Sequence, residues 1–214
     1  MADLIFYTNP QSRGQTIRWM LEEVGEPYET EILDYASTMK QDPYLSINPM
    51  GKVPAIRHKG KVVTEVAAIC CYLADAFPQA HLAPPLEDRA DYYRWIFFTS
   101  GPVEAAFSNK AAGWEPTPER QRMFGYGNYN LAINTLEKAV TGREYLAADH
   151  FTAADLFVGA NVNFMLAFNL LEPRPAFVDY ARRMTDRPAY HRAKDIDSKL
   201  IAEMQPAPTQ PQPA

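Results

Sequence analysis

The stretch that decides the fold of the N-terminal half spans residues 4–33 and reads LIFYTNPQSRGQTIRWMLEEVGEPYETEIL. Its first four residues form a short apolar run that ends at Asn9-Pro10, as expected of a buried strand followed by a loop. Apolar residues at positions 17, 20, 21 and 24 then repeat with the spacing of one helical face, and Gly25 is a typical C-terminal stop. Residues 28–33 predict a second strand. A strand, a helix and a strand in this order predict a parallel pair with a right-handed crossover.

Two more strands and a helix follow. Val53–Ile56 begins a third strand, and Lys59-Gly60 is suited to a two-residue hairpin turn into residues 62–64. A helix with an apolar face formed by residues 69–76 comes next. Residues 34–49 are expected to be irregular because prolines interrupt them. These patterns together predict a small mixed sheet flanked by helices.

The second half of the chain is expected to be all-helical. The proline-rich residues 78–85 indicate a linker. Beyond it, apolar residues repeat at helical spacing in two segments, residues 92–103 and residues 123–140, the second ended by Gly142. Thr152 and Asp155 have the spacing of a capping box, and the helix that they open is apolar on most sides, from position 153 to about position 171. Because such a helix is buried, the pattern predicts a bundle around it. The expected fold class is therefore α/β plus all-α.

Composition excludes several classes of function. The chain has 214 residues and a net charge of −5, so no basic surplus indicates nucleic acid or an anionic membrane as a partner. Neither a long apolar run nor a leader-like N-terminus suggests a membrane or secreted protein. The only cysteines are the adjacent Cys70 and Cys71, which favours a reducing, cytoplasmic location. The histidines have no metal-ligand spacing, so no metal is expected. Residues 205–214, mostly Pro, Gln and Ala, are expected to form a disordered tail.

Ser12 is the first candidate for chemistry because it lies where the first strand joins the first helix. Free N–H groups and the dipole at a helix N-terminus favour negative charge. A hydroxyl there can donate a hydrogen bond to a thiolate, the nucleophilic form of a thiol, and lower the pKa of that thiol. The alternative is that Ser12 serves only as a helix N-cap.

Two further segments have features of a binding site for a charged peptide. Pro54 at a strand start suits a turn, with a cis bond as one possibility, which leaves the N–H and C=O groups of Val53 free for a ligand backbone. Lys52 can meet a carboxylate. At Glu65-Val66 a helix begins, so its amides can bind an anion while Glu65 binds an ammonium group. The alternatives are an ordinary loop with a solvated lysine, and an acidic residue that only complements the helix dipole.

Taken together, these motifs resemble the cytosolic glutathione S-transferase family, with a serine-type and bacterial-like pattern, over about residues 4–192. The motifs that carry the resemblance are Ser12-Arg13-Gly14, Asn48–Pro54, Thr64-Glu65 before Ala68–Leu73, Tyr145-Leu146, Phe151–Asp155 and Arg187–Tyr190. The resemblance implies an N-terminal thioredoxin-like domain at residues 1–78 and a C-terminal helical bundle domain at residues 86–204. It also implies a cytoplasmic homodimer that takes glutathione as co-substrate in a pocket between the domains.

The resemblance also implies roles for particular residues. Ser12 is expected to stabilise the thiolate, with Tyr7 and Asn9 as second choices. Val53, beside Pro54, is expected to pair with the cysteinyl part of glutathione. The other implied contacts are Lys40 or Gln41 with Lys52 for the glycyl carboxylate, Glu65 and the Val66 N–H for the γ-glutamyl end, and Phe107, Trp114 and Phe164 for an apolar wall around the second substrate.

Two positions bear on activity. The family often has a serine where this chain has Val66, and its hydroxyl binds the γ-glutamyl carboxylate. Because a hydrogen bond to a charged group contributes about 1.5–3 kcal/mol, weaker glutathione binding is expected here. Other classes of the family have a cysteine at the position of Ser12, which favours thiol reduction, whereas a serine favours conjugation.

The function expected from the sequence is therefore an enzyme, a glutathione transferase that conjugates glutathione to a small, electrophilic, hydrophobic substrate in a detoxification reaction. Two alternatives stay open. One is a non-catalytic interaction module with the same fold, an alternative suggested by Val66 and by the proline-rich tail. The other is a glutathione-dependent thiol reductase or peroxidase.

Overall fold

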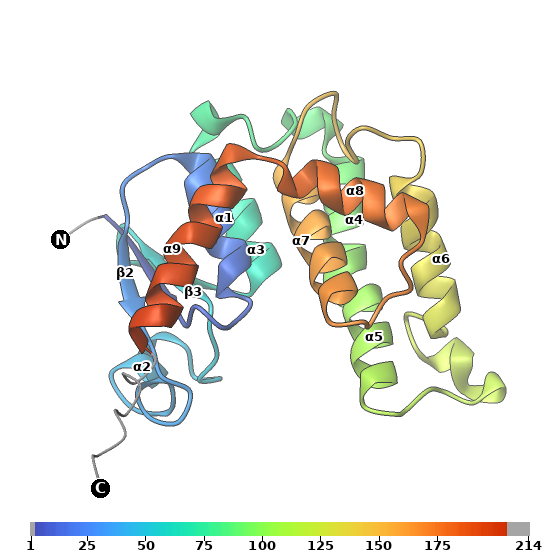
Figure 1. Cartoon of the computed structure of the whole chain (residues 1–214), viewed down its shortest axis with the longest axis horizontal. Helices are drawn as coiled ribbons and strands as arrows, with labels where there is room; N and C mark the ends of the chain where they lie inside the picture. The colour runs from blue at the N-terminus through green and yellow to red at the C-terminus, as the bar shows by residue number, and fades with distance from the viewer. Residues whose placement is uncertain (1–2, 205–214) are drawn as a thin grey trace, which may run out of the picture.

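The computed structural model describes residues 3–204, and the expectation of a disordered tail at residues 205–214 lies outside this range. Figure 1 shows a sheet with flanking helices beside a group of longer helices. The four strands are β1 (Leu4–Thr8), β2 (Glu29–Ile32), β3 (Ala55–His58) and β4 (Lys61–Thr64). Their order is β2-β1-β3-β4, with β1 and β2 parallel and the other pairs antiparallel. Within residues 3–204 no helix has the length and apolar character needed to cross a membrane.

The predicted β-α-β unit and hairpin are confirmed. Helix α1 (Gly14–Val24) connects the parallel strands β1 and β2. Gly25 ends α1 with φ 76°, and its N–H donates to the Leu21 carbonyl oxygen at 3.0 Å. Lys59 and Gly60 have φ of 49° and 79°, so both turn residues adopt the left-handed conformation that a type I′ hairpin requires.

The two faces of the sheet carry separate cores. Leu4 and Phe6 belong to the core under α1 and α3 (Val66–Ala76), which continues into the helical half. Ile5 and Tyr7 alternate with them and face the opposite side, where they pack with Tyr44 of the short helix α2 (Tyr44–Ile47). Residues 34–49 are therefore less irregular than predicted, because this helical turn covers the second face of the sheet.

The second half is helical, as predicted. Its α-helices are α4 (Ala90–Phe98), α5 (Glu104–Ala111), α6 (Tyr129–Val140), α7 (Ala153–Ala167), α8 (Pro175–Thr185) and α9 (Pro188–Met204). Short 3₁₀ turns lie at Thr38–Lys40, Pro78–Ala80, Leu86–Asp88 and Pro118–Met123. A π-helical turn, Thr99–Val103, joins α4 to α5. Pro102 lies inside this turn and has no N–H to donate, which accounts for the locally widened ladder.

Two helix boundaries differ from the prediction. The helix expected to include residues 123 and 126 begins only at Tyr129, because Gly127 takes a left-handed φ of 67° and Asn128 caps the helix. The Asn128 Oδ1 accepts the Leu131 N–H at 2.9 Å. Helix α7 ends at Ala167, four positions before the predicted end. At the start of α6 a glycine and a cap outside the apolar pattern set the boundary, and just beyond α7 Asn169 takes a left-handed φ of 55°.

Helix α7 lies at the centre of the helical half, as its apolar sequence predicts. The capping box at its start is present, and Thr152 and Asp155 are both fully buried. Asp155 Oδ2 accepts the Thr152 N–H at 3.0 Å and its hydroxyl at 2.9 Å. The carboxylate therefore anchors the first turn of the helix around which the other helices pack.

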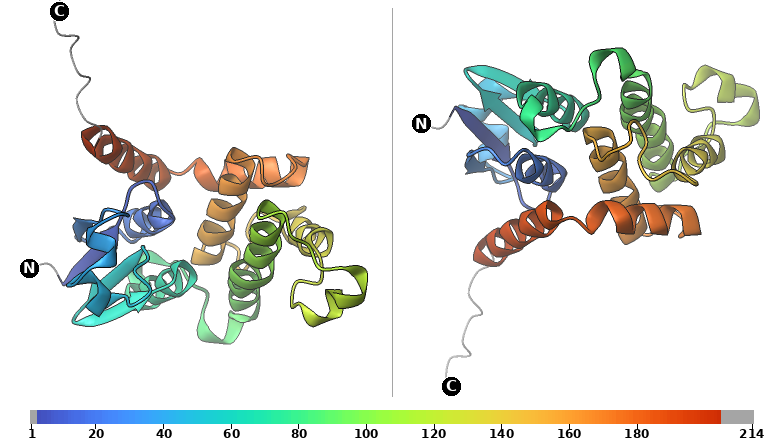
Figure 2. Two further views of the ribbon diagram at one scale, coloured as in Figure 1. Left: turned by 90° about the horizontal axis from the view of Figure 1, so that it is seen from below. Right: turned by 90° about the horizontal axis from the view of Figure 1, so that it is seen from above.

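The C-terminal helix α9 returns to the N-terminal half. Both views in Figure 2 place α9 alongside α1, on the side of α1 away from α3. The Arg18 Nε of α1 lies 3.0 Å from the Asp197 Oδ1 of α9, and both side chains are buried. Arg187 pairs with Glu23 at 2.6 Å at the start of α9. The helical half predicted for residues 86–204 thus ends on a helix that packs against the sheet half and lines the junction between them.

His58 predicts a pH dependence of stability. Its ring is 4% exposed, its Nδ1 lies 3.0 Å from the Tyr72 hydroxyl, and it stacks on Phe77 at 5.1 Å. Burial lowers the pKa of His58, with Lys59 adding to the effect. As pH falls below the ordinary histidine value of about 6.5, the unfolded chain therefore takes up a proton that the folded chain resists, and stability is lost. The melting temperature is expected to fall faster between about pH 7 and pH 5.5 in the natural protein than in His58→Phe, which keeps the ring stack. Parallel slopes in thermal melts of the two proteins would exclude this role.

Candidate functional site

Two cavities open at the junction of the two halves, one on each side of Arg13. The α3 cavity, of about 680 Å³, lies between the start of α3 and the α4–α5 segment. The residues that line it are Arg13, Asn48, Lys52, Val53, Pro54, Glu65, Val66, Ala67, Ala68, Phe97, Ser100, Glu104 and Phe157. The α9 cavity, of about 290 Å³, lies between α1, α7 and α9. The residues that line it are Ser12, Arg13, Gln15, Thr16, Trp19, Ala160, Asn161, Asn163, Phe164, Ala167, Phe168, Tyr190, Ala193, Lys194 and Asp197.

The floor of the α3 cavity is the loop that ends in a cis bond between Val53 and Pro54, as the sequence suggested. The Asn48 Nδ2 and the Tyr44 hydroxyl both donate to the Lys52 carbonyl oxygen, the first at 2.8 Å, and hold this loop in place. The N–H and C=O groups of Val53 have no hydrogen-bond partner within residues 3–204. They are free to pair with the backbone of a bound peptide, in the manner of an added strand.

The start of α3 forms the second wall of this cavity. Glu65 has φ 68° and ψ 122°, a conformation that costs free energy for a residue with a side chain and that gathers at functional sites. The first N–H groups of α3, beginning at Val66, have no intrahelical acceptor and form an anion site. Glu65 and Lys52 are exposed, and among the described residues neither has an ion-pair partner within 4.0 Å. The α3 cavity thus presents an anion site, a carboxylate and an ammonium to a zwitterionic ligand.

Arg13 separates the two cavities and lines both. Its Nη1 and Nη2 atoms lie 3.1 and 3.2 Å from the two carboxylate oxygens of Glu104, a bidentate pair. Its Nη1 also donates to the Asn161 Oδ1 at 3.3 Å, and its guanidinium lies 4.7 Å from the centre of the Phe164 ring and 5.5 Å from that of Phe107. Sequence reasoning identified Arg13 only as part of a motif, because partners on α5 and α7 leave no local signal.

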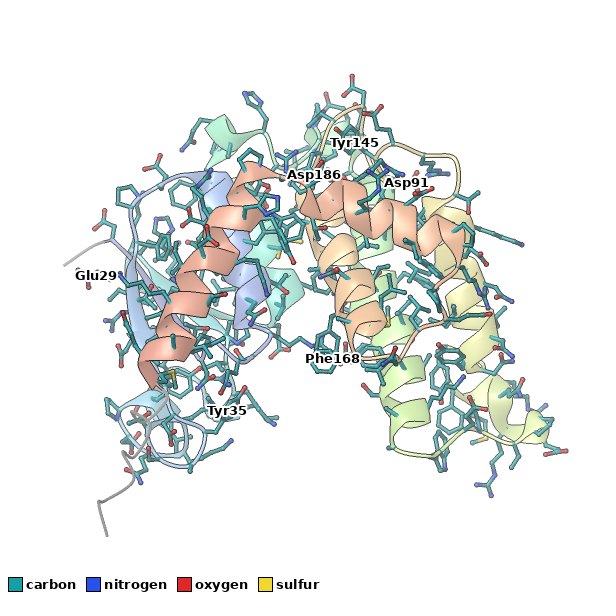
Figure 3. The ribbon with its side chains drawn as sticks, in the orientation of Figure 1. Glu29, Tyr35, Asp91, Tyr145, Phe168 and Asp186 are labelled. Atoms are coloured by element: carbon teal, nitrogen blue, oxygen red, sulfur yellow. The ribbon has the colours of Figure 1, made fainter. Side chains whose placement is uncertain are left out.

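The α9 cavity is walled mainly by apolar side chains. Trp19, Phe164 and Tyr190 come from three different helices, and Phe168 lies at the C-terminal end of α7 (Figure 3). Of the three residues predicted to line a second-substrate pocket, only Phe164 lines this cavity. Phe107 is buried under the Arg13 guanidinium, and Trp114 packs on Phe124 at 5.2 Å in the α5–α6 connection, outside both cavities.

Ser12 lines the α9 cavity, and its hydroxyl already has two partners. The Oγ donates to the Asn9 carbonyl oxygen at 2.6 Å and accepts the Gly14 N–H at 2.9 Å. This is the arrangement of a turn before a helix: the N-cap position of α1 is Arg13, without a side-chain cap, so Ser12 stands one position before the cap and is not the N-cap itself. To donate to a thiolate, the hydroxyl must rotate away from the Asn9 carbonyl.

The second choices for the thiol-activating residue lie outside both cavities. Tyr7 is 1% exposed on the sheet face covered by α2, and burial raises its pKa. Asn9 is also 1% exposed. Its Nδ2 donates to the Leu33 carbonyl oxygen at 2.8 Å and its Oδ1 accepts the Gln11 N–H at 2.9 Å, which ties the loop after β1 to the end of β2.

The two residues predicted beside Lys52 for the glycyl carboxylate also lie outside the cavity. Lys40 donates from its Nζ to the Gly51 carbonyl oxygen, and Gln41 is exposed. Cys70 is buried and Cys71 half-buried on α3, and neither lines a cavity. Burial raises the pKa of both thiols. Within residues 3–204 no group of three or more His, Cys, Asp or Glu side chains is arranged to hold a metal.

Comparisons with known proteins show a similarity to glutathione S-transferases. Residues 12–76 match the family model described as the N-terminal domain of glutathione S-transferase. The glutathione S-transferase GstA of Escherichia coli O157:H7 is 26% identical over 190 residues, which cover 86% of this chain and 90% of the relative. Protein LigF of a Sphingobium species is 28% identical over 206 residues, which cover 76% of this chain and 77% of the relative.

A solved structure shares the whole architecture. A glutathione transferase homologue from Sulfitobacter, crystallised with bound glutathione, superposes with a TM-score of 0.72 at 23% identity, over 92% of this chain and 99% of that one. The thioredoxin-like sheet, the helical half and the matched residues agree: over residues 12–76 this chain carries the N-terminal domain of the glutathione S-transferase family, and over most of its length it is similar to glutathione S-transferases.

Proposed function

We propose that this protein conjugates glutathione to an electrophilic, largely apolar substrate. The observation that carries the proposal is that Arg13 lines two cavities of different character. The α3 cavity has the charges and free backbone groups that suit a peptide, and the α9 cavity has the apolar walls that suit an electrophile. A thiol bound in the first cavity is then delivered to a substrate held in the second, which supplies the proximity that conjugation needs.

Glutathione fits the α3 cavity group by group. Its cysteinyl backbone pairs with the free N–H and C=O of Val53. Glu65 binds the γ-glutamyl ammonium, while the free N–H groups at the start of α3 bind the carboxylate beside it. Lys52 binds the glycyl carboxylate, because Lys40 already donates to the Gly51 carbonyl oxygen. The Sulfitobacter relative with bound glutathione supports this choice of ligand.

The chemistry requires a thiolate. An ordinary thiol has a pKa near 8.5, so at neutral pH only a few per cent is ionised. The thiol releases its proton to solvent, and the sulfur then forms a bond to the electrophilic carbon while the leaving group departs with its electron pair. Two features favour the thiolate: the N-terminus of α1 and the guanidinium of Arg13. Ser12 contributes a hydrogen bond once its hydroxyl turns from the Asn9 carbonyl.

A thiol reductase has less support, because neither cysteine lines a cavity and a mixed disulfide needs an accessible one. Reduction of hydroxyethyl disulfide is the assay that would favour it. A non-catalytic role is tested by retention on immobilised glutathione together with the absence of turnover.

Two substitutions of one ion pair test the proposal with opposite expected results. Arg13→Gln removes the positive charge and is expected to raise the pKa of the bound thiol by about one unit, which corresponds to about tenfold less thiolate below that pKa. Glu104→Gln removes the compensating negative charge and keeps Arg13, so the thiol pKa is expected to fall. The measurement is the ultraviolet absorbance of the thiolate across pH, with kcat/KM for 1-chloro-2,4-dinitrobenzene in parallel.

The matched controls are Ser12→Ala and Ser12→Thr. If the Ser12 hydroxyl serves the thiolate, the alanine variant raises the thiol pKa and the threonine variant restores it. The conjugation proposal fails if the natural protein binds glutathione and gives no turnover with several unrelated electrophiles. The role of Arg13 fails if both substitutions of the ion pair shift the thiol pKa in the same direction.

A further inference from the structure

The α9 cavity carries an uneven charge that the proposed reaction does not by itself explain. Three of its lining residues are charged: Arg13, Lys194 and Asp197. Arg13 already has a carboxylate partner, Glu104, in a bidentate pair on the side of the α3 cavity. Asp197 is neutralised by Arg18, whose Nε lies 3.0 Å from its Oδ1 in a buried pair. The charge of the cavity therefore depends on Lys194.

Lys194 is exposed on α9, three residues before Asp197, and lines the cavity from that side. Within residues 3–204 it has no carboxylate within 4.0 Å. Its charge does act on Asp197: burial raises the pKa of Asp197, and Arg18 and then Lys194 lower it. Even so, one carboxylate faces two cations, so this group keeps one net positive charge.

The opposite wall adds to the same field. Ser12 and Arg13 bring the N-terminus of α1 to the cavity, and its free N–H groups favour negative charge. The third wall contributes Asn161, Asn163 and Phe164 from α7, with Phe168 just beyond its end, and no charged residue. A protein with a net charge of −5 thus holds an apolar cavity with a positive lining. An electrophile that is apolar and neutral would leave this charge unused.

We propose that the second substrate is an apolar electrophile bearing an anionic group, such as an aryl carboxylate, and that Lys194 selects for it. The carboxylate lies against Lys194, and the electrophilic carbon lies toward Ser12 and Arg13. Lys194 acts as a specificity-determining residue and takes no part in bond formation. This inference rests on the proposed transferase function, since it describes the second substrate of the same reaction.

Binding without reaction tests the charge preference separately from catalysis. The probes are 3-nitrobenzoate and 3-nitrobenzamide, a pair matched in size that lacks a leaving group, titrated by calorimetry into the full-length protein saturated with glutathione. The benzoate is expected to bind about 1.5- to 5-fold more tightly, which corresponds to the roughly 0.2–1 kcal/mol that an exposed ion pair contributes. Lys194→Gln is expected to remove this difference. Lys199→Gln, an exposed lysine on the same helix outside both cavities, is expected to preserve it.

Conjugation of the chlorinated pair, 4-chloro-3-nitrobenzoate and 4-chloro-3-nitrobenzamide, each corrected for its uncatalysed rate, completes the test. A higher kcat/KM for the benzoate, carried by KM and lost in Lys194→Gln, supports the inference. Equal binding of the two probes by the natural protein, or the same preference in Lys194→Gln, overturns it. If the charge preference in binding is present and neither chloride is turned over, the cavity assignment holds and the transferase proposal fails. If both chlorides are turned over without preference, the transferase proposal holds and the role of Lys194 in substrate choice fails.

Discussion

Replacing Asp155 with alanine is expected to lower the free energy of unfolding by about 3–5 kcal/mol. Its Oδ1 accepts the Leu146 N–H at 2.8 Å and the Tyr180 hydroxyl at 3.0 Å. Its Oδ2 accepts the N–H and hydroxyl of Thr152. Alanine leaves four buried donors without an acceptor. Because each unsatisfied donor costs about 1–3 kcal/mol, partial relaxation still leaves a loss of this size.

The loss should appear as a drop in melting temperature of about 2–4 °C per kcal/mol for a chain of this length. Burial raises the pKa of Asp155, while the hydrogen bonds from Leu146, Thr152 and Tyr180 lower it.

Asp155→Asn is expected to be nearly as destabilising as Asp155→Ala, because the asparagine amide nitrogen is a donor and would face the donors that the carboxylate accepted. Asp149→Ala is the matched control: Asp149 is exposed, its partner is the adjacent His150, and its loss should change stability by less than about 0.5 kcal/mol. A stability of Asp155→Ala within that range of the natural protein would contradict the anchoring role of the carboxylate.

Replacing Gly14 with alanine is expected to reduce conjugation by at least about tenfold, because it displaces the loop that carries Ser12 and Arg13. A Cβ at position 14 would lie 1.9 Å from the Thr8 Oγ1 and 2.9 Å from the Ser12 Oγ. Thr8 is 1% exposed at the end of β1, so it has no free space to move into. The end of β1 and the start of α1 must therefore separate, with a stability cost of about 1–3 kcal/mol.

A second substitution, at Thr8, should relieve this steric clash. Thr8→Ala removes the nearest atom, the Oγ1, which donates to the Asn9 carbonyl oxygen at 3.3 Å. The double variant Thr8→Ala, Gly14→Ala should therefore recover part of the lost turnover, so that the two substitutions are non-additive. Recovery should be partial, because the Thr8 Cβ still lies 3.2 Å from the new methyl group. The test compares the two single variants with the double variant. It measures turnover, glutathione affinity by calorimetry, and melting temperature. Full activity in Gly14→Ala, or no recovery in the double variant, would show that this close approach does not position the loop.

Elements with local signals could be predicted from the sequence. The β-α-β unit, the hairpin at Lys59-Gly60 and the capping box at Thr152 depend on residues close together in the chain, and the structure confirms all three. The cis bond at Pro54 belongs to the same group, because its signal is a proline at a strand start. Helix ends were predicted less well where a glycine or a cap outside the apolar pattern decides them, as before Tyr129.

The residues of the candidate site also differ in how well the sequence predicts their positions. Val53, Lys52, Glu65 and Val66 lie in two segments that neighbouring strands bring together, and all four line the α3 cavity. Lys40 and Gln41 lie outside it, because a loop has no period from which a side-chain direction can be read. Tyr7 shows a related difficulty. Strand alternation puts Phe6 and Tyr7 on opposite faces, but both faces are buried, so their hydrophobicity does not indicate which one meets α1.

By itself the sequence determined the order of elements, the parallel first unit, the hairpin and the buried central helix, because each follows from periodicity or from turn chemistry within a few residues. Only the tertiary structure decided that Arg13 meets Glu104, that α9 returns to α1 through Arg18 and Asp197, and that Lys194 lines the second cavity. Contacts between residues more than 90 positions apart depend on how whole helices pack, and packing is set by the shapes of many side chains at once. The cavity walls, and with them substrate choice, arise at that level.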